Sequence, residues 1–233
     1  MIAQGADRLT QVRTFKWSWL FYGAIFLAAA SIIAFATFRP IQVLPRITLA
    51  PGFVLTDQDG HALTNEDLRG QIVLYNFTYT RCRATCVQTS PIMRAVQNQL
   101  SDVITDGVTI TLVTVSFDSE YDKPDVLRAY ATELGADTAH WLFLSGDANR
   151  VKYMLGDGFN VYYAPNARGT FDFDPVFVLV DGWGIMRADY RNQLPTSDRI
   201  IRDMGLLAQE VKNSVGIGKY AYEAAHLFLC YPR

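Results

Sequence analysis

Residues 72–86 read Ile-Val-Leu-Tyr-Asn-Phe-Thr-Tyr-Thr-Arg-Cys-Arg-Ala-Thr-Cys. The apolar run at the start is rich in branched and aromatic side chains and predicts a buried strand. The spacing of Met93, Val96 and Leu100 predicts a helix after the two cysteines. Two thiols four residues apart can form a disulfide, exchange it with another disulfide, or bind a soft metal ion. The stretch therefore predicts a two-cysteine site at the end of a central strand.

Strand and helix patterns alternate through the rest of the chain. Two further strands are predicted at 108–117 and 141–144, and Pro124 is expected to open a helix that ends at Gly135. Residues 175–180 and 185–190 predict an antiparallel hairpin, and a last helix is expected from Ser197. This order predicts an α/β domain with a mixed sheet flanked by helices, which is the outline of a thioredoxin-like fold.

The amino-acid composition excludes two classes of protein. The chain has 233 residues, half of them hydrophobic, and a formal net charge of −2. It has no run of Lys and Arg, so it lacks the basic surface that nucleic-acid binding needs. Three cysteines and three histidines are too few for a disulfide-rich scaffold and enough for one small site.

The N-terminal region predicts a membrane anchor. Residues 17–38 form an uncharged run of 22 residues between Lys16 and Arg39. At about 1.5 Å per residue, a helix of this length spans a hydrocarbon core of about 30 Å. A cleavable signal peptide is the alternative, because Ala34-Phe35-Ala36 resembles a cleavage site. The run exceeds the usual apolar region of about 7–15 residues, so we expect an uncleaved signal anchor.

Flanking charges predict the orientation of this anchor. Three basic residues precede the span, and Arg39 and Arg46 follow it. The excess on the first side predicts that residues 1–16 are cytoplasmic and that the main domain is periplasmic, on a single-pass protein of the inner membrane. Residues 39–52 hold three prolines and are expected to form a stalk. In an oxidising compartment, the cysteine pair is expected to rest as a disulfide.

Several segments coincide with one known family. The matching stretches occur in family order at 55–60, 68–71, 77–82, 91–94, 117–124 and 141–146. Over about residues 50–212 the chain resembles the Sco/SenC family. The resemblance implies a membrane-tethered thioredoxin-like domain, here at 53–213, that delivers copper to cytochrome c oxidase or reduces its cysteines during assembly. Subunits of that or another electron-transfer complex, and the lipid bilayer, are the implied partners.

The resemblance assigns Cys82 and Cys86 as a redox pair and as metal ligands. Thiolates suit Cu(I), and the expected helix start at Cys86 favours its thiolate. Arg81 and Arg83 are expected to act in the same direction. Asp118 and the stretch 122–124 are expected to shape the entrance to the site. A disulfide that only staples the loop is the structural alternative.

This chain departs from the family at the position of the third metal ligand. Counting back from the late strand, the expected histidine falls on Phe173, between Asp172 and Asp174. Carboxylates are hard ligands and would be weak substitutes for copper. Two positions beside the cysteines also depart from the family, because Arg83 and Val87 stand where it has proline. We therefore expect the three-ligand copper site to be missing and dithiol chemistry, which needs no third ligand, to remain.

The histidines elsewhere in the chain offer no obvious replacement. His61, His140 and His226 are the three in the sequence, and none lies between 140 and 226. Each is expected to be a surface residue or a satisfied core residue. A thioredoxin-like peroxidase would also place a cysteine after this strand, but the spacing of the two cysteines fits Sco/SenC better.

The C-terminal extension, residues 214–233, is rich in aromatic and aliphatic side chains. It is too short and interrupted for a second membrane span. It is expected either to pack on its own domain or to be buried against a partner. Cys230 is expected to be a small buried hydrophobic residue.

Two functions follow from the sequence. In the first, this is a periplasmic Sco-like protein that acts by thiol–disulfide exchange or copper delivery. In the second, the fold is retained in an accessory subunit of a membrane electron-transfer or photosynthetic complex.

Overall fold

The computed structural model describes residues 17–38, 41–82, 86–103, 107–167, 169–191, 193–214, 216 and 218–228. Side chains are also left undescribed at 17, 18, 35, 36, 38, 86–88, 227 and 228. The predicted cytoplasmic segment, Arg83 and Cys230 lie outside this description. The chain divides after Pro40 into two compact units.

The first unit contains one helix. Helix α1 spans Trp17–Phe38, the bounds predicted from the uncharged run, and has no acidic residue in its first turn or basic residue in its last. Among the residues that the structure describes, no helix reaches the length and apolar character needed to cross a membrane. The anchor therefore stays a prediction from the sequence.

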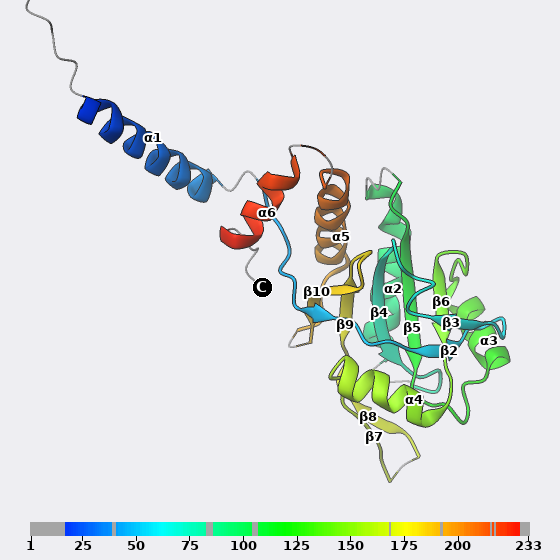
Figure 1. The fold of residues 1–233 in the computed structure, drawn as a ribbon. Helices are drawn as coiled ribbons and strands as arrows, with labels where there is room; N and C mark the ends of the chain where they lie inside the picture. Colours follow the sequence, from blue (N-terminus) through cyan, green and yellow to red (C-terminus); the bar gives the residue numbers. More distant parts are fainter. Residues whose placement is uncertain are drawn as a thin grey trace, which may run out of the picture. The chain divides into compact units, whose positions relative to one another are not determined.

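The second unit, residues 41–233, is built on a mixed six-stranded sheet (Figure 1). The strand order is β1 (Thr48–Leu49), β10 (Ile185–Tyr190), β9 (Phe177–Val180), β4 (Ile72–Thr78), β5 (Ile110–Ser116) and β6 (Trp141–Leu144). Strands β4, β5 and β6 are parallel, whereas β9 is antiparallel to both β4 and β10. Two hairpins lie outside the sheet: β2 (Val54–Thr56) with β3 (Ala62–Thr64), and β7 (Tyr163–Pro165) with β8 (Phe171–Phe173). The predicted α/β class and mixed sheet are confirmed.

The predicted helices are present in the predicted order, and α6 follows them as a helix that the sequence analysis did not predict. In chain order the helices are α2 (Cys86–Gln99), α3 (Pro124–Leu134), α4 (Ala148–Tyr153), α5 (Ser197–Lys212) and α6 (Gly218–Phe228). Pro124 begins α3, and Gly135 ends it in the left-handed conformation, at φ 66°. The carboxylate of Asp147 caps α4 by accepting from two backbone N–H groups.

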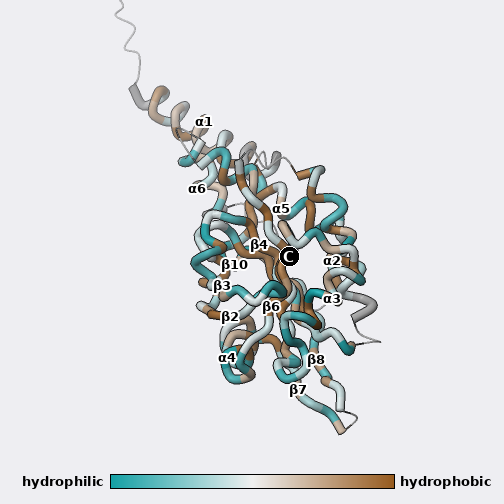
Figure 2. Tube along the Cα trace, turned by 90° about the vertical axis from the view of Figure 1, so that its right-hand side faces the viewer, coloured by the Kyte–Doolittle hydropathy of each residue, from teal (hydrophilic) through white to brown (hydrophobic). Residues whose placement is uncertain are grey.

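Both faces of the sheet are covered by apolar layers. Helices α2, α3 and α5 pack on one face, and α4 with the segment before β4 packs on the other. Figure 2 shows the hydrophobic colour concentrated along the centre of the domain, around β4, and more hydrophilic residues outside it. The site-bearing strand is thus enclosed on both sides.

Strand β4 is buried along its whole length. Leu74 faces the layer formed by α2, α3 and α5, whereas Val73 and Tyr75 face the opposite layer. This alternation follows from the two-residue period of a strand. Because β4 also has a strand on each side, its end is a fixed point for the residues that follow.

The stalk predicted at 39–52 differs from the structure. From residue 41 the chain belongs to the domain, and Val43 and Leu44 are buried. Strand β1 pairs with β10, with Thr48 opposite Met186. Three prolines suggested a detached segment, but an edge strand tolerates nearby proline because only one side of it needs hydrogen bonds.

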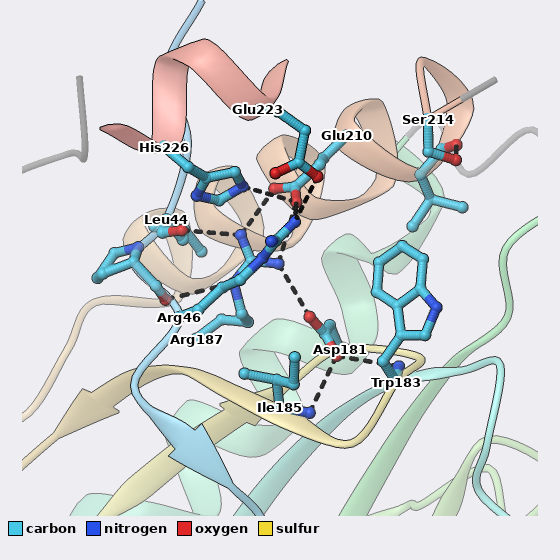
Figure 3. Close-up of polar contacts among 12 residues, drawn as sticks. Leu44, Arg46, Asp181, Trp183, Ile185, Arg187, Glu210, Ser214, Glu223 and His226 are labelled. Carbon is cyan, nitrogen blue, oxygen red and sulfur yellow. Dashed lines mark hydrogen bonds and ion pairs between the residues drawn. The ribbon is translucent and has the colours of Figure 1, made fainter. Parts of the chain in front are cut away.

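A buried ion cluster links the beginning and the end of the domain (Figure 3). The Arg187 guanidinium, 1% exposed, lies 2.9 Å from the carboxylate of Asp181 and 2.7 Å from that of Glu210. It also donates to the backbone carbonyls of Leu44, at 2.7 Å, and Pro45, at 3.3 Å. One side chain of β10 therefore binds the N-terminal segment, the β9–β10 turn and α5.

The cluster also binds the C-terminal helix α6. The Nε2 atom of His226 lies 2.9 Å from Oε1 of Glu210. Burial opposes ionisation of Glu210, but the hydrogen bonds from His226 and Arg187 outweigh it and lower the pKa of this carboxyl to about 2. Glu210 is thus charged near neutral pH and holds α6 against α5. The inner face of the extension thus packs on its own domain. This packing is one of the two arrangements expected for the extension.

The substitution Arg187→Ala tests the cluster. It leaves the Asp181 and Glu210 carboxylates buried without their cation, so we expect the free energy of unfolding to fall by about 3–5 kcal/mol. Arg128→Ala is the matched control, because Arg128 pairs with Asp59 at the surface and its loss is expected to cost about 0–1 kcal/mol. Urea unfolding of residues 41–233 measures both. Equal losses would contradict the assigned role of Arg187.

Candidate functional site

The cysteine loop begins where β4 ends. Residues 79–82 follow the strand directly, and α2 begins at Cys86, as predicted. Cys82 is disulfide-bonded, and its backbone N–H donates to the carbonyl of Tyr79 at 3.2 Å. The side chain of Cys86 lies outside the described residues. Cys82 is thus in a disulfide, and its pairing with Cys86 stays a prediction.

Two buried carboxylates from the loop after β5 hold the residues before Cys82. Asp122, with no exposed surface, accepts from the backbone N–H of Thr80 at 2.9 Å and from its hydroxyl at 2.5 Å. The hydroxyl of Ser116 also donates to Asp122. Parallel pairing brings the two loops together, because Thr78 of β4 lies opposite Ser116 of β5. Asp122 was expected only near the entrance, and it holds the cysteine loop itself.

Arg81 is paired as well as positively charged. Its Nε donates to the buried carboxylate of Asp118 at 2.9 Å, and its guanidinium lies 4.4 Å from the centre of the Tyr121 ring. The hydrogen bond that Arg81 donates to Asp118 raises the pKa of Arg81. Because a carboxylate offsets its charge, Arg81 favours a nearby thiolate less than its sequence position suggested.

An aromatic cluster occupies the place where the resemblance to Sco/SenC implies a metal ligand. Phe173 packs edge-on against Phe117, with ring centres 5.0 Å apart, and against Tyr79 at 6.1 Å. Tyr163 and Phe171 complete the cluster, Tyr163 stacking on Phe117 at 4.8 Å. Cys82 packs against the same apolar core. Phe173 is thus held among rings and offers no electron pair to a metal.

The two aspartates beside Phe173 are exposed, whereas Phe171 and Phe173 are partly buried. This alternation is the ordinary consequence of a strand. Asp172 accepts from the side-chain amide of Asn166 at 2.9 Å. Among the side chains that the structure describes, no three His, Cys, Asp or Glu residues are grouped to hold a metal.

The histidines lie beside separate carboxylates. His140 is exposed and lies 3.0 Å from Asp137, and His226 is partly buried against Glu210. His61 is exposed, 3.7 Å from Asp57. These are the surface and satisfied-core positions that the sequence predicted.

The model of the SCO1/SenC family matches residues 43–208, more than half of the chain. The chain belongs to the SCO1/SenC family. The match begins within the segment expected to be a stalk and ends before α6.

Curated and solved relatives agree with this membership. This SCO1/SenC protein is 29% identical to the SCO1 protein homolog of Bacillus subtilis over 155 residues, which cover 65% of this chain and 79% of that one. It is 26% identical to Bradyrhizobium japonicum ScoI, solved with copper bound, with a TM-score of 0.57 and coverage of 68% and 99%.

A third likeness supports the thioredoxin-like fold. BsSco, described as a member of the Sco family of cytochrome c oxidase assembly proteins with a disulfide switch, is 24% identical. Its TM-score is 0.62, and the match covers 72% of this chain and 97% of that one. The mixed α/β domain of this SCO1/SenC protein is thus the thioredoxin-like fold of solved Sco structures.

Sequence reasoning missed two parts of the site. The β7–β8 hairpin carries three rings of the aromatic cluster, and closely spaced aromatics at 162–163 and 171–173 were its only signal. The role of Asp122 needed the parallel β4–β5 pair, because 42 residues separate it from Thr80.

The substitution Asp122→Ala tests the support of the cysteine loop. It leaves the Thr80 N–H, the Thr80 hydroxyl and the Ser116 hydroxyl without their acceptor, so we expect a loss of about 3 kcal/mol in the free energy of unfolding. The freed loop should also let dithiothreitol reduce the disulfide at Cys82 faster. Asp125→Ala removes an exposed carboxylate from α3 and serves as the control. A reduction rate that matches the wild-type rate would exclude this role for Asp122.

Proposed function

We propose that this SCO1/SenC protein acts by thiol–disulfide exchange through Cys82 and Cys86 during assembly of a respiratory membrane complex. The observation that carries the proposal is the disulfide at Cys82, on a loop that two buried carboxylates hold at the end of β4. Cys86 is the proposed disulfide partner, because it lies four residues away and begins α2. The clients are subunits of a cytochrome c oxidase-type or other electron-transfer complex.

The two cysteines have different roles in this proposal. The N-terminal end of α2 stabilises negative charge, so Cys86 supplies the attacking thiolate. The thiolate attacks one sulfur of a client disulfide, forms a mixed disulfide and releases one client thiolate. Cys82 then loses its proton and attacks the sulfur of Cys86, which closes the Cys82–Cys86 disulfide and releases the second client thiolate.

This exchange balances without a metal. Two electrons pass from the cysteine pair to the client, and the two released thiolates take up two protons. A dithiol reductant in the same compartment returns the pair to its reduced state by the reverse steps.

The described side chains do not supply a third ligand for copper. Phe173 is held in the aromatic cluster, Asp172 and Asp174 are exposed, and the histidines pair with other carboxylates. Copper delivery is therefore the less supported branch of the family's activity for this chain, and no step of the proposal uses it.

Membrane tethering is part of the proposal and rests on the sequence. An uncharged run of 22 residues forms α1, and the basic residues before it favour a cytoplasmic N-terminus. The domain 41–233 is then periplasmic, a compartment in which disulfides persist.

An accessory subunit is the second candidate function. It was favoured by the lost histidine and by the apolar extension. The inner face of α6 packs on its own domain through Glu210, so that face needs no other protein to cover it. An inert cysteine pair would favour this candidate.

Cysteine variants of reduced residues 41–233 test the exchange, with glutathione disulfide as the probe. Cys82→Ser should accumulate a mixed disulfide with glutathione at Cys86, because no thiol resolves it. Cys86→Ser should react at least about tenfold more slowly, because the thiolate at the helix start is lost. Cys230→Ser is the matched control and should behave as wild type. Intact-mass spectrometry over time measures all four proteins, and a requirement for Cys230 would contradict the proposed pair.

The substitution Phe173→His tests whether the residue at position 173 decides copper binding. We expect the reduced wild-type domain to hold no tightly bound Cu(II) and the variant to gain up to one ion, because imidazole joins two thiolates as a ligand. Asp172→His is the control, since it adds the same group at an exposed position of β8. Equilibrium dialysis with metal analysis and visible absorption measure binding. Tight binding by the wild-type domain would restore copper delivery.

A further inference from the structure

Helix α6 has two faces with different surroundings. Its inner face bears Tyr222, Ala225 and His226: Ala225 is buried, His226 contacts Glu210, and the Tyr222 hydroxyl accepts from Asn213 at 3.2 Å. Of these contacts, Figure 3 shows the one between His226 and Glu210, which holds the helix on α5. The opposite face therefore has a defined direction, away from the domain core.

The outer face carries an apolar stripe. Tyr220, Ala224 and Leu227 are spaced by four and three residues, which places these positions on one side of a helix. Tyr220 is 76% exposed, although burial of such a ring is normally favourable. Beyond α6 the sequence continues with Leu229, Cys230 and Tyr231. The stripe thus presents apolar positions where a surface helix normally has polar ones.

A second aromatic side chain lies beside this helix. Trp183, in the β9–β10 turn, is 50% exposed. It lines a pocket of about 350 Å³ together with Lys219, Tyr222 and Glu223 of α6. Exposed Trp and Tyr rings next to a Lys are the combination found at the boundary between lipid headgroups and acyl chains.

The ion cluster also joins α6 to the first residues of the domain. Arg187 binds the carbonyl of Leu44, and Arg46 lies 3.3 Å from Glu223 of α6. Leu44 follows Phe38 by only six residues. The proposed anchor would therefore tether the domain to the bilayer through a short segment.

We propose that the outer face of α6, with Trp183 beside it, docks on the phospholipid surface and gives the domain a second attachment to the membrane. This inference rests on the proposed membrane anchor, which would tether the domain to the bilayer. The anchor supplies one point of attachment, and α6 supplies another that restricts rotation of the domain. The direction in which the cysteine loop faces would then be restricted relative to the bilayer.

Vesicle binding by residues 41–233 tests the proposal without α1. This unit contains both apolar layers of the sheet, so it can be studied alone. The probe is a vesicle of phosphatidylcholine and phosphatidylglycerol at a ratio of about 3:1, chosen because anionic lipid attracts Lys219. We expect the wild-type unit to co-sediment with these vesicles.

The double substitution Tyr220→Ser and Leu227→Ser should weaken binding at least about tenfold, because it removes apolar area that the lipid would bury. It leaves the contacts of Tyr222 and His226 in place. The matched control is Tyr153→Ser with Tyr162→Ser, which removes two exposed rings, 68% and 59% exposed, from outside α6. Thermal unfolding followed by circular dichroism checks that each variant is folded.

Three results would overturn the proposal: no binding by the wild-type unit, equal binding by the outer-face variant, or equal weakening in the control. A lipid-independent dimer in light scattering that the outer-face variant abolishes would assign the stripe to a second copy of the chain. Carbonate extraction of the full chain tests the anchor separately. If carbonate releases the full chain from membranes, the proposed anchor is wrong. The vesicle result on α6 still stands by itself, because it is obtained without α1.

Discussion

The enclosure of β4 is the constraint on which the site depends. The strand is paired on both sides and covered on both faces, so the residues after it start from one defined position. Asp118 and Asp122 then hold Arg81 and Thr80 from the neighbouring loop. A disulfide that exchanges with other proteins must be reachable and still have a defined geometry. Rigid support of the residues before Cys82, with Cys82 itself only partly buried, meets both conditions.

The aromatic cluster explains how the fold persists without the family's third ligand. A histidine that no longer bound a metal would leave a polar ring beside an apolar core. Phe173 instead adds apolar contacts with Tyr79 and Phe117, and such ring pairs are each worth about 0.5–1.5 kcal/mol beyond simple burial. Position 173 thus supplies packing where the resemblance to Sco/SenC implies a ligand, and the chemistry proposed for the site is that of the two thiols.

The Arg187 cluster includes residues that lie outside the part of this chain that the family model matches. Glu210 and His226 both follow residue 208, where the family match ends. Through Arg187 they connect α6 to residues 44–46, at the opposite end of the domain sequence. Breaking such a buried pair is costly, so α6 is a stable part of the domain rather than a loose tail. Its apolar outer stripe is consequently held in place.

The sequence by itself determined the order of the elements, the helix at 17–38, the strand before the cysteines and the absence of histidine at 173. These are local properties, because hydrophobic period, capping residues and residue identity are read within a short window. Only the tertiary structure decided that Asp122 holds Thr80, that residues 48–49 join the sheet and that Arg187 links α5 to Leu44. Those contacts join residues tens to more than a hundred positions apart, and parallel pairing and sheet order, which no local pattern encodes, bring them together.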